Sequence, residues 1–536
     1  MARSSRSRID PRNSRKRRAL AALVVVALAL TGCSGNSGGS TGTPSGNDDV
    51  ANRDPAAVYR FSWSQSPTTF DPDKITSGVL ETFAYPVYDT LVMLNPKGEL
   101  VPMLAKSWEV LDGGKALQLS LIENWKFHDG TPFNAAAVKA KIERSQTLEG
   151  STNKQALASV TSVEAVDDLT VKLTIDGPVA PLLGALATRA GMMLSPAVFD
   201  KPDLDIKPAG GSGMFEVTEN VKGSKVVYKA VENYWDKDAL LVAGLEIGNF
   251  GDDAARLNAL TRGNYQHTHL RTFQIQEAET AGLVVNQDFP FRTHNLYLNT
   301  SRSKFSDIRV RQAVNHAIDR NAIAQGLYEG YCKPIAQQLP ESHWAHNPDV
   351  KGDYFAYDPA KAKSLLAEAG LPNGFTIDAI VLNLELYVSL AEAIQAQLKE
   401  VGITMNIRPL AFGEAVDSFT VRKDSDAWVM ASQSVPDVSQ MTKDFYLATG
   451  SWNPGGFSNP EFTRLHEEAQ ATLDQAERAP LYKQLWAEVA KQAAPVVHIC
   501  TPTGPEDTWK KGVHGITTWK GGIRQFRGVW IEKGVN

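Results

Sequence analysis

The body of the 536-residue sequence lacks the short motifs that mark common enzyme sites. Beyond residue 52 it contains neither Gly-x-Ser-x-Gly, nor His-Glu-x-x-His, nor a phosphate-binding loop. Without such a motif, no nucleophile and base pair stands out. The sequence therefore favours a binding protein over a hydrolase or another enzyme, and we expect no catalytic residues and no cofactor.

The chain also lacks an excess of positive charge outside its first residues. Residues 1–32 hold eight of the 55 basic and one of the 60 acidic side chains, so the remainder carries 47 basic and 59 acidic side chains, a net charge of −12. Such a surface repels phosphates, which argues against a nucleic-acid partner and against electrostatic binding to anionic lipid. No second apolar run approaches the ~20 residues that span a bilayer, so we expect a soluble body.

The first 33 residues have the pattern of an export signal. A basic segment up to Arg18 is followed by an apolar run over residues 19–30, which is too short to cross a membrane but fits a signal-peptide core. The run ends in Leu-Thr-Gly-Cys at residues 30–33, which resembles a bacterial lipobox. We therefore predict cleavage after residue 32, lipidation of Cys33, and a protein anchored to the cell membrane on its extracytoplasmic face. An uncleaved anchor helix is the alternative.

Residues 33–52 are rich in Gly, Ser, Thr, Asn and Asp, and they bury too little apolar surface to offset the entropy of ordering, so they predict a flexible tether. About 480 residues follow, which is more than one core usually holds, so two or three lobes are expected. The only cysteines left are Cys332 and Cys500. They lie far apart in the sequence and nothing local supports their pairing. We expect two buried thiols, with a disulfide as the alternative.

Strand and helix patterns alternate along the body, which predicts α/β lobes. Two-residue alternation predicts strands at residues 58–63, 116–122 and 169–175. Short strands are also expected between the later helices, at residues 375–382, 403–409 and 428–431. Helices are expected at residues 77–94, 135–144 (with Asn134 as N-cap), 307–327, 358–369, 390–401 and 460–494. No internal repeat is present.

Six groups of residues match a known family in order. They are 70–72 (FDP) with 88–91 (YDTL); 104–109 (LAKSWE) with 125–133 (WKFHDGTPF); 211–215 (GSGMF); 233–235 (NYW); 307–313 (DIRVRQA) with 317–320 (AIDR); and 357–362 (YDPAKA) with 365–370 (LLAEAG). In this order the chain resembles the extracellular solute-binding proteins, family 5, of peptide and nickel ABC importers. The resemblance covers nearly all of residues 59–529.

The resemblance implies a two-lobed fold like that of periplasmic binding proteins (type II, cluster C) with an enlarged first lobe. Lobe I would comprise residues 53–293, with an extra subdomain at about 86–210, and lobe II residues 294–495. Residues 496–536 would return to lobe I. The extended, polar-alternating segment 292–299 is suited to a hinge. Such a protein would capture a peptide or similar small solute by lobe closure and deliver it to ABC permease subunits, and we expect it to act as a monomer.

The charge anchors of a dipeptide site are absent from the expected positions. In dipeptide-binding relatives an aspartate meets the ligand's ammonium, and Ser434 falls where that aspartate would lie. No arginine occurs near residues 381–383, where the carboxylate would be received. An unpaired buried charge costs several kcal/mol, so a free dipeptide is disfavoured as ligand. Asp437 is a candidate for a cationic group, or else a turn-capping aspartate after Pro436.

Tryptophans are the other candidates for the site. Trp63, Trp428, Trp452 and Trp519 lie in or beside segments that line the cleft in relatives, and indole rings bind apolar, sugar or cationic groups. Core packing is the alternative for each of them. Trp108, Trp125 and residues 234–235 belong to scaffold motifs and are interpreted as structural. The pairs His267-x-His269 and His343-x-x-His346 lack a suitable third ligand, so no metal site is predicted.

Alternatives to a peptide importer remain open. The same fold suits a receptor for a non-peptide solute such as an oligosaccharide, an opine-like compound or a metal chelate. It also suits a surface sensor or adhesin without transport. Genes for a permease and an ATPase beside this one would favour an importer.

Overall fold

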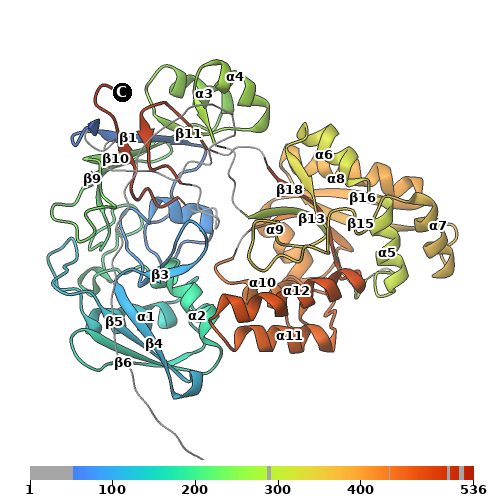
Figure 1. The fold of residues 1–536 in the computed structure, drawn as a ribbon, viewed down its shortest axis with the longest axis horizontal. Coiled ribbons are helices and arrows are strands. Elements are labelled where there is room, and N and C mark those ends of the chain that lie inside the picture. Colours follow the sequence, from blue (N-terminus) through green and yellow to red (C-terminus); the bar gives the residue numbers. More distant parts are fainter. Residues whose placement is uncertain are drawn as a thin grey trace, which may run out of the picture. The chain divides into compact units, whose positions relative to one another are not determined.

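The computed structural model describes residues 52–286, 291–302, 304–433, 435–503, 507–517 and 524–535, which form one compact unit (Figure 1). Cys33, the predicted signal peptide and most of the predicted tether lie outside the described residues. Within the described part, no helix has the length and apolar character needed to cross a membrane.

Two large sheets organise the chain into two lobes. Lobe I contains a seven-stranded sheet in the order β12-β19-β11-β1-β10-β9-β8, and lobe II a six-stranded sheet in the order β14-β18-β13-β17-β15-β16. β19 (Asp507–Trp509) comes after every strand of lobe II, so both ends of the chain build lobe I. The predicted α/β, two-lobed fold is confirmed.

Lobe I also carries a smaller sheet in the order β4-β5-β7-β6 and a hairpin, β2-β3. The strands are β1 (Val58–Trp63), β2 (Val92–Leu94), β3 (Leu100–Pro102), β4 (Ala105–Leu111), β5 (Ala116–Leu121), β6 (Val160–Ala165), β7 (Thr170–Ile175), β8 (Phe215–Val221), β9 (Lys225–Ala230), β10 (Gly244–Asn249), β11 (His267–His269), β12 (Val284–Val285), β20 (Val513–His514) and β21 (Trp530–Ile531). The helices are α1 (Ala135–Thr147), α2 (Val179–Leu186), α3 (Asp253–Thr261) and α4 (Ile275–Thr280).

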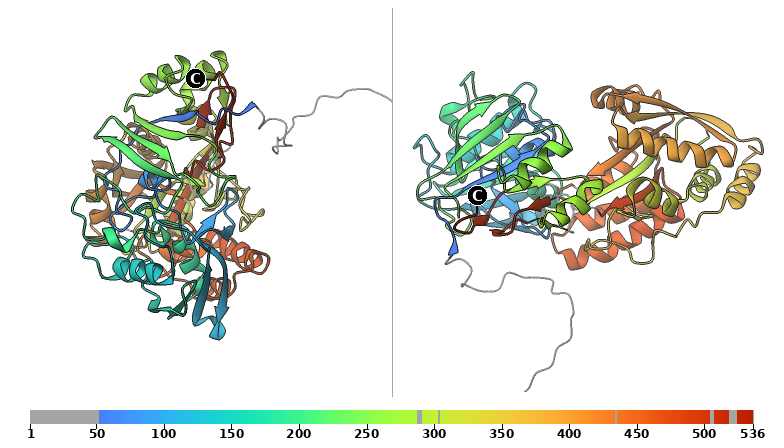
Figure 2. Two further views of the ribbon diagram at one scale, coloured as in Figure 1. Left: turned by 90° about the vertical axis from the view of Figure 1, so that its left-hand side faces the viewer. Right: turned by 90° about the horizontal axis from the view of Figure 1, so that it is seen from above.

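Lobe II has helices on both faces of its sheet (Figure 2). Leu296 and Leu298 of β13 pack into one apolar cluster and Tyr297 into another, as the alternation of a strand requires. The strands are β13 (Arg292–Leu298), β14 (Cys332–Pro334), β15 (Phe375–Leu382), β16 (Ile403–Leu410), β17 (Ala427–Gln433) and β18 (Val496–Pro502). The helices are α5 (Ile308–Ala317), α6 (Arg320–Tyr328), α7 (Pro359–Glu368), α8 (Glu385–Glu400), α9 (Phe412–Val416), α10 (Val438–Tyr446), α11 (Pro460–Gln470) and α12 (Gln475–Lys491).

The helix predicted over residues 77–94 is wrong. The segment forms a 3₁₀ helix, Gly78–Phe83, followed by turns and then by β2. Pro86 lies in the middle of the segment and cannot donate the backbone hydrogen bond that a continuous helix needs. The other predicted helices are present, and residues 307–327 and 460–494 each contain two helices instead of one.

The segment predicted to be a hinge is β13, which is paired on both sides. Its Thr293 lies opposite Ser432 of β17, and its His294 lies opposite Cys500 of β18. The lobes were expected to join at β13 and β18, but both strands belong to the six-stranded sheet of lobe II. The chain passes between the two large sheets before Arg292 and after Pro502.

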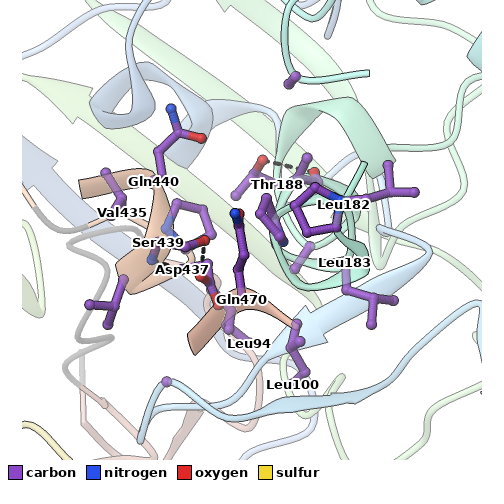
Figure 3. A pocket seen from close by; sticks show the side chains of 18 of the residues that line it. Leu94, Leu100, Leu182, Leu183, Thr188, Val435, Asp437, Ser439, Gln440 and Gln470 are labelled. Atoms are coloured by element: carbon purple, nitrogen blue, oxygen red, sulfur yellow. Dashed lines mark hydrogen bonds between the residues drawn. The ribbon is translucent and has the colours of Figure 1, made fainter. Parts of the chain in front are cut away.

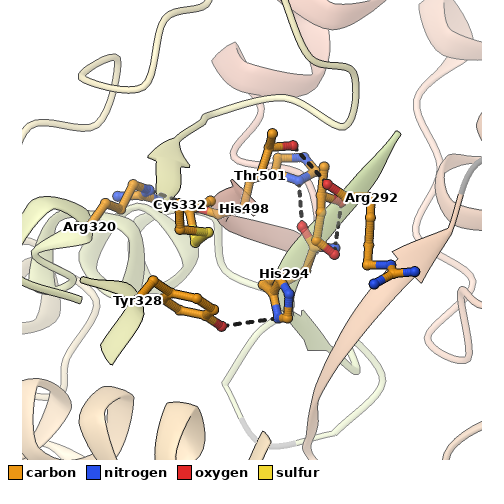
Figure 4. Close-up of a disulfide and its surroundings, with 10 residues drawn as sticks. Arg292, His294, Arg320, Tyr328, Cys332, His498 and Thr501 are labelled. Atoms are coloured by element: carbon orange, nitrogen blue, oxygen red, sulfur yellow. Dashed lines mark hydrogen bonds between the residues drawn. A yellow bond between two sulfur atoms is a disulfide. The ribbon is translucent and has the colours of Figure 1, made fainter. Parts of the chain in front are cut away.

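Cys332 and Cys500 form a disulfide, so the expectation of two free thiols is wrong (Figure 4). The two cysteines are 168 residues apart in sequence, but β14 and β18 are antiparallel neighbours, which brings their Cα atoms within 5.5 Å. The pairing of strands that are far apart in sequence cannot be predicted from local sequence patterns. The bond ties the edge strand β14 to the strand that leads out of lobe II.

Candidate functional site

A cavity of about 1150 Å³ lies between the two lobes. Lobe I contributes α2, the β2-β3 hairpin and part of residues 152–159, and lobe II contributes the start of β13, residues 343–344 and the beginning of α10. Figure 3 shows side chains of both walls around this space. Ligand pockets are concave, mostly apolar spaces of roughly 300–1000 Å³, and they often lie between domains, so this cleft is the candidate site.

Part of the lobe I wall of the cleft is apolar. Leu94 and Leu100 project from the β2-β3 hairpin, and Leu182 and Leu183 from α2 (Figure 3). Trp108 of β4, which the sequence motif led us to interpret as purely structural, also lines this wall and is half-buried. Apolar walls of this kind bind ligand carbon atoms and need few polar groups to fix orientation.

The lobe II wall is built around the first turn of α10. Asp437 is the N-cap of this helix and accepts a hydrogen bond from the backbone N–H of Ser439 at 2.8 Å. The same Oδ1 atom accepts from Nη2 of Arg478, at 2.7 Å. Burial alone would raise the pKa of Asp437, but the hydrogen bonds and the charge of Arg478 outweigh it and hold that pKa below its usual value. Asp437 thus caps a helix and already has a cationic partner.

Arg478 is held firmly in this position. Its Nε donates to the carbonyl of Ala469 at 2.9 Å, and its guanidinium lies 5.5 Å from the ring centres of Trp344 and Tyr482. Asp437 and Arg478 are both buried and both line the cleft. A charged end of a solute would have to compete with a pair that is already formed.

A second ion pair, between a buried glutamate and a partly exposed arginine, lies in the lobe I wall. Nη1 of Arg189 donates to Oε1 of Glu81 at 2.7 Å, and both residues line the cleft. Burial raises the pKa of Glu81 despite this partner. Each wall therefore carries one such ion pair, beside further charged residues that also line the cleft.

The two walls touch at Gly184 in α2. A Cβ atom at this position would lie 3.1 Å from Cβ of Pro436, which is closer than most side chains approach, and 3.5 Å from Cβ of Asp437, which is an ordinary contact. Glycine therefore allows α2 of lobe I to pack directly against the loop before α10 of lobe II. This contact forms one boundary of the cleft.

Three of the predicted tryptophans lie in packed surroundings. Trp63 contacts Phe61 and Phe83. Trp428 has no exposed surface and lies between Phe419 and Trp452. Within the described residues, Trp63, Trp428 and Trp452 are not among those that line the cavity, whereas Asp437 is. Ser434 and Trp519 lie outside the described residues.

Several residues that line the cleft were not predicted from the sequence. Phe291 and Arg292 stand at the start of β13, and His343 and Trp344 lie in the segment after β14. The His343 ring packs edge-on against Phe291, with 4.9 Å between ring centres. In the part of the chain that the structure describes, no cluster of three or more His, Cys, Asp or Glu residues is arranged to hold a metal ion.

In the histidine pair His267 and His269, which was also considered as a metal site, only His267 is buried. His267 contacts Tyr59 through Nδ1 and Asp507 through Nε2, the latter at 3.0 Å, and Arg524 donates to the same carboxylate at 2.7 Å. This network joins β1, β11 and β19 within lobe I. It secures the segment that returns from lobe II.

Comparison with known proteins gives consistent matches. Residues 99–465 match the model of the bacterial extracellular solute-binding proteins, family 5. The glutathione-binding protein GsiB of Pectobacterium atrosepticum is 28% identical over 442 residues, which cover 78% of this chain and 85% of that protein. The dipeptide-binding protein of Escherichia coli K12 is 28% identical over 504 residues, covering 87% and 93%.

Solved structures share the fold along most of the chain. The periplasmic binding protein DppA from Helicobacter pylori, in complex with the peptide STSA, has a TM-score of 0.78 and 24% identity, covering 91% of this chain and all of that one. The binding protein AgaA from A. tumefaciens R10, in complex with agropinic acid, has a TM-score of 0.75 and 26% identity, covering 89% and 99%.

Proposed function

The chain belongs to the bacterial extracellular solute-binding proteins of family 5, and from this premise we propose that it captures a peptide or a similar small solute outside the cytoplasm and delivers it to the permease of an ABC importer. The observation that carries the proposal is the cleft of about 1150 Å³ whose two walls come from different lobes. A solute that touches both walls favours the closed arrangement, because its contacts are lost when the lobes separate.

The charges of the cleft narrow the choice of solute. The pairs Asp437–Arg478 and Glu81–Arg189 are already closed, with N–O distances of 2.7 Å in each. A free dipeptide brings two full charges close together, and each would need its own partner once buried. We therefore infer a solute with a substantial apolar portion, such as a peptide of three or more residues or a modified peptide. It leaves the site chemically unchanged, since the protein acts as a receptor.

When the lobes close, they would rotate about the two chain segments that connect the two large sheets. We propose that lobe II begins at Arg292 and ends at Pro502, because the first and last strands of that interval, β13 and β18, pair with each other. The boundaries inferred from the sequence, at residues 294 and 495, would then move outward by a few residues. We propose that the smaller sheet, together with α1 and α2, forms the extra subdomain expected at about 86–210.

We also propose that the protein is anchored through a lipid on Cys33. The support is the basic, apolar and Leu-Thr-Gly-Cys succession of residues 1–33. An anchor on a polar tether would keep the receptor close to its permease. When cells are grown with radioactive fatty acid, the wild-type protein should carry label and Cys33→Ala should not. Equal labelling of both would contradict the anchor.

A non-peptide solute is the second candidate. Its support is the similarity to AgaA, whose structure contains agropinic acid. Both candidates predict binding in the same cleft, so a panel of solutes distinguishes them.

Binding is tested by thermal unfolding of the purified full-length chain in detergent. Tripeptides, dipeptides, oligosaccharides and opines would each be added at a fixed concentration. A solute that binds only the folded protein raises Tm, with about 2.7 kcal/mol of stabilisation at 100 times Kd. We expect tripeptides to raise Tm more than dipeptides. A rise with an opine or a glycan and with no peptide would contradict the peptide proposal.

A further inference from the structure

The loop between α11 and α12 brings lobe II against the smaller sheet of lobe I. α11 lies beside α2 of lobe I (Figure 1). Leu473 in this loop packs against the buried apolar cluster that joins the β4-β5-β7-β6 sheet to α1 and α2, which includes Leu119, Val138 and Leu182. Among the described residues that belong to this cluster or pack against it, Leu473 is the one from lobe II. The loop therefore joins the lobes at a place separate from the two chain segments that connect the large sheets.

Local hydrogen bonds fix the turn that carries Leu473. Asp474 is the N-cap of α12 and accepts a hydrogen bond from the backbone N–H of Ala476 at 2.7 Å. The backbone N–H of Asp474 donates to Oγ1 of Thr472 at 3.2 Å, and the hydroxyl of Thr472 donates to Oε2 of Glu477 at 2.8 Å. Because the turn is already ordered, little backbone entropy is lost when Leu473 packs against lobe I.

The contact made by this loop is apolar and lies next to the other contact between the walls. Leu473 and Leu182 of α2 both line the cleft, and two residues further along α2, Gly184 lies against Pro436. Apolar surface is buried here when the lobes approach each other and returns to water when they separate. Its burial favours the closed arrangement and requires no particular group on the solute.

We propose that the contact of Leu473 with the cluster of the smaller sheet, here named the closure contact, stabilises the closed arrangement of the lobes whichever solute is bound. The proposal rests on the lobe closure of the proposed function, but not on the identity of the solute. A solute that is held between closed lobes binds more tightly when the closed arrangement is more populated, and every solute gains by the same factor. The smaller sheet is then the surface of lobe I onto which lobe II closes.

The test removes the closure contact and leaves the ion pairs of the cleft in place. Leu473→Ser is compared with wild type and with Leu371→Ser, each as the full-length chain in detergent. Leu371 is the matched control, because it is also a half-buried leucine in a loop of lobe II but packs against the core of lobe II itself. Backbone hydrogen exchange is measured by mass spectrometry with no solute added, and the affinity for trileucine is measured by calorimetry.

We expect the amides of α2 to exchange about fivefold faster in Leu473→Ser than in wild type, because this short helix opens more often once the lobe II loop no longer covers it. The affinity for trileucine should fall by about the same factor, since the closed arrangement becomes less populated. Leu371→Ser should leave the exchange of α2 and the affinity within about twofold of wild type, because it does not touch lobe I.

Equal exchange of α2 in wild type and Leu473→Ser would overturn the closure contact, even if trileucine bound more weakly, because Leu473 would then contact only the solute. Unchanged affinity of Leu473→Ser for trileucine would overturn it as well. So would the same acceleration of exchange in Leu371→Ser, which would reflect a general loosening of the fold. If no solute bound the wild-type chain, the proposed function would fail, whereas the exchange of α2 would still decide whether the closure contact exists.

Discussion

Replacing Arg478 with leucine should lower the free energy of unfolding by about 3–5 kcal/mol, because Asp437 would remain buried without its cationic partner. Arg478 is only 4% exposed and Asp437 only 9%. Arg478 also donates to the carbonyl of Ala469 and to the hydroxyl of Tyr482, at 2.9 Å and 3.0 Å. Urea unfolding followed by tryptophan fluorescence measures the change.

Two further variants separate the ion pair from simple loss of packing. Asp437→Asn/Arg478→Leu removes both charges and should recover part of the loss, because no uncompensated carboxylate remains. Arg464→Leu in α11 is the matched control, since its bonds to Glu461 and Glu468 are exposed and such pairs contribute roughly 0–1 kcal/mol. Equal losses for Arg478→Leu and Arg464→Leu would show that the buried pair contributes no more than a surface pair.

The same pair predicts a pH dependence with a definite sign. The folded-state pKa of Asp437 is lower than that of an unfolded aspartate, which is about 3.9. Its contribution to stability is therefore complete above that unfolded value and is lost as the pH falls through the folded value. The acid-induced loss of stability should be smaller in Asp437→Asn/Arg478→Leu than in wild type. If both proteins lost the same free energy of unfolding on acidification, the contribution assigned to Asp437 would be contradicted.

Opening the disulfide should have an effect of similar size. Cross-linking two residues 168 positions apart restricts the unfolded chain, and the chain-entropy relation gives about 5 kcal/mol for a loop of that length, within a measured range of roughly 0–5 kcal/mol. We expect wild type to unfold at a clearly lower urea concentration after reduction. The midpoint of Cys332→Ala/Cys500→Ala should not respond to the reductant.

The comparison of reduced and oxidised wild type is the decisive one, since it leaves both side chains in place. Alanine substitution removes two buried sulfur atoms and adds a packing loss of its own. If wild type had the same midpoint with and without reductant, and chemical labelling showed that the thiols had been freed, the bond would contribute nothing to stability.

Local pattern was sufficient for most of the secondary structure. Alternation identified β5 and β7, and Asn134 was correctly predicted as a cap, because each signal lies within a few residues. The failures needed information from elsewhere in the chain. The helix expected over residues 77–94 is interrupted where Pro86 lacks a donor, and the Cys332–Cys500 bond depends on which strands become neighbours.

The site was harder to predict than the fold. Tryptophan was chosen because its ring suits ligands, but the same ring suits a core, and Trp428 is packed between Phe419 and Trp452. Arg478 and Asp437 are 41 residues apart in sequence, so no local pattern predicts that they form an ion pair. Gly184 matters because it packs against Pro436 of the other lobe, and this contact exists only after both lobes have folded.

The central claim is that the cleft between the lobes captures the solute. Gly184→Leu tests it directly, because a larger side chain at this position would hold α2 away from Pro436. The residues that line the cavity are unchanged in this variant, since Gly184 is not one of them. Gly326→Ala in α6 is the control, since no atom lies within 4 Å of its added Cβ. The measurement is calorimetric binding of trileucine to wild type and both variants. We predict that wild type and Gly326→Ala bind alike and that Gly184→Leu binds at least tenfold more weakly, whereas equal binding by all three proteins would contradict capture between the lobes.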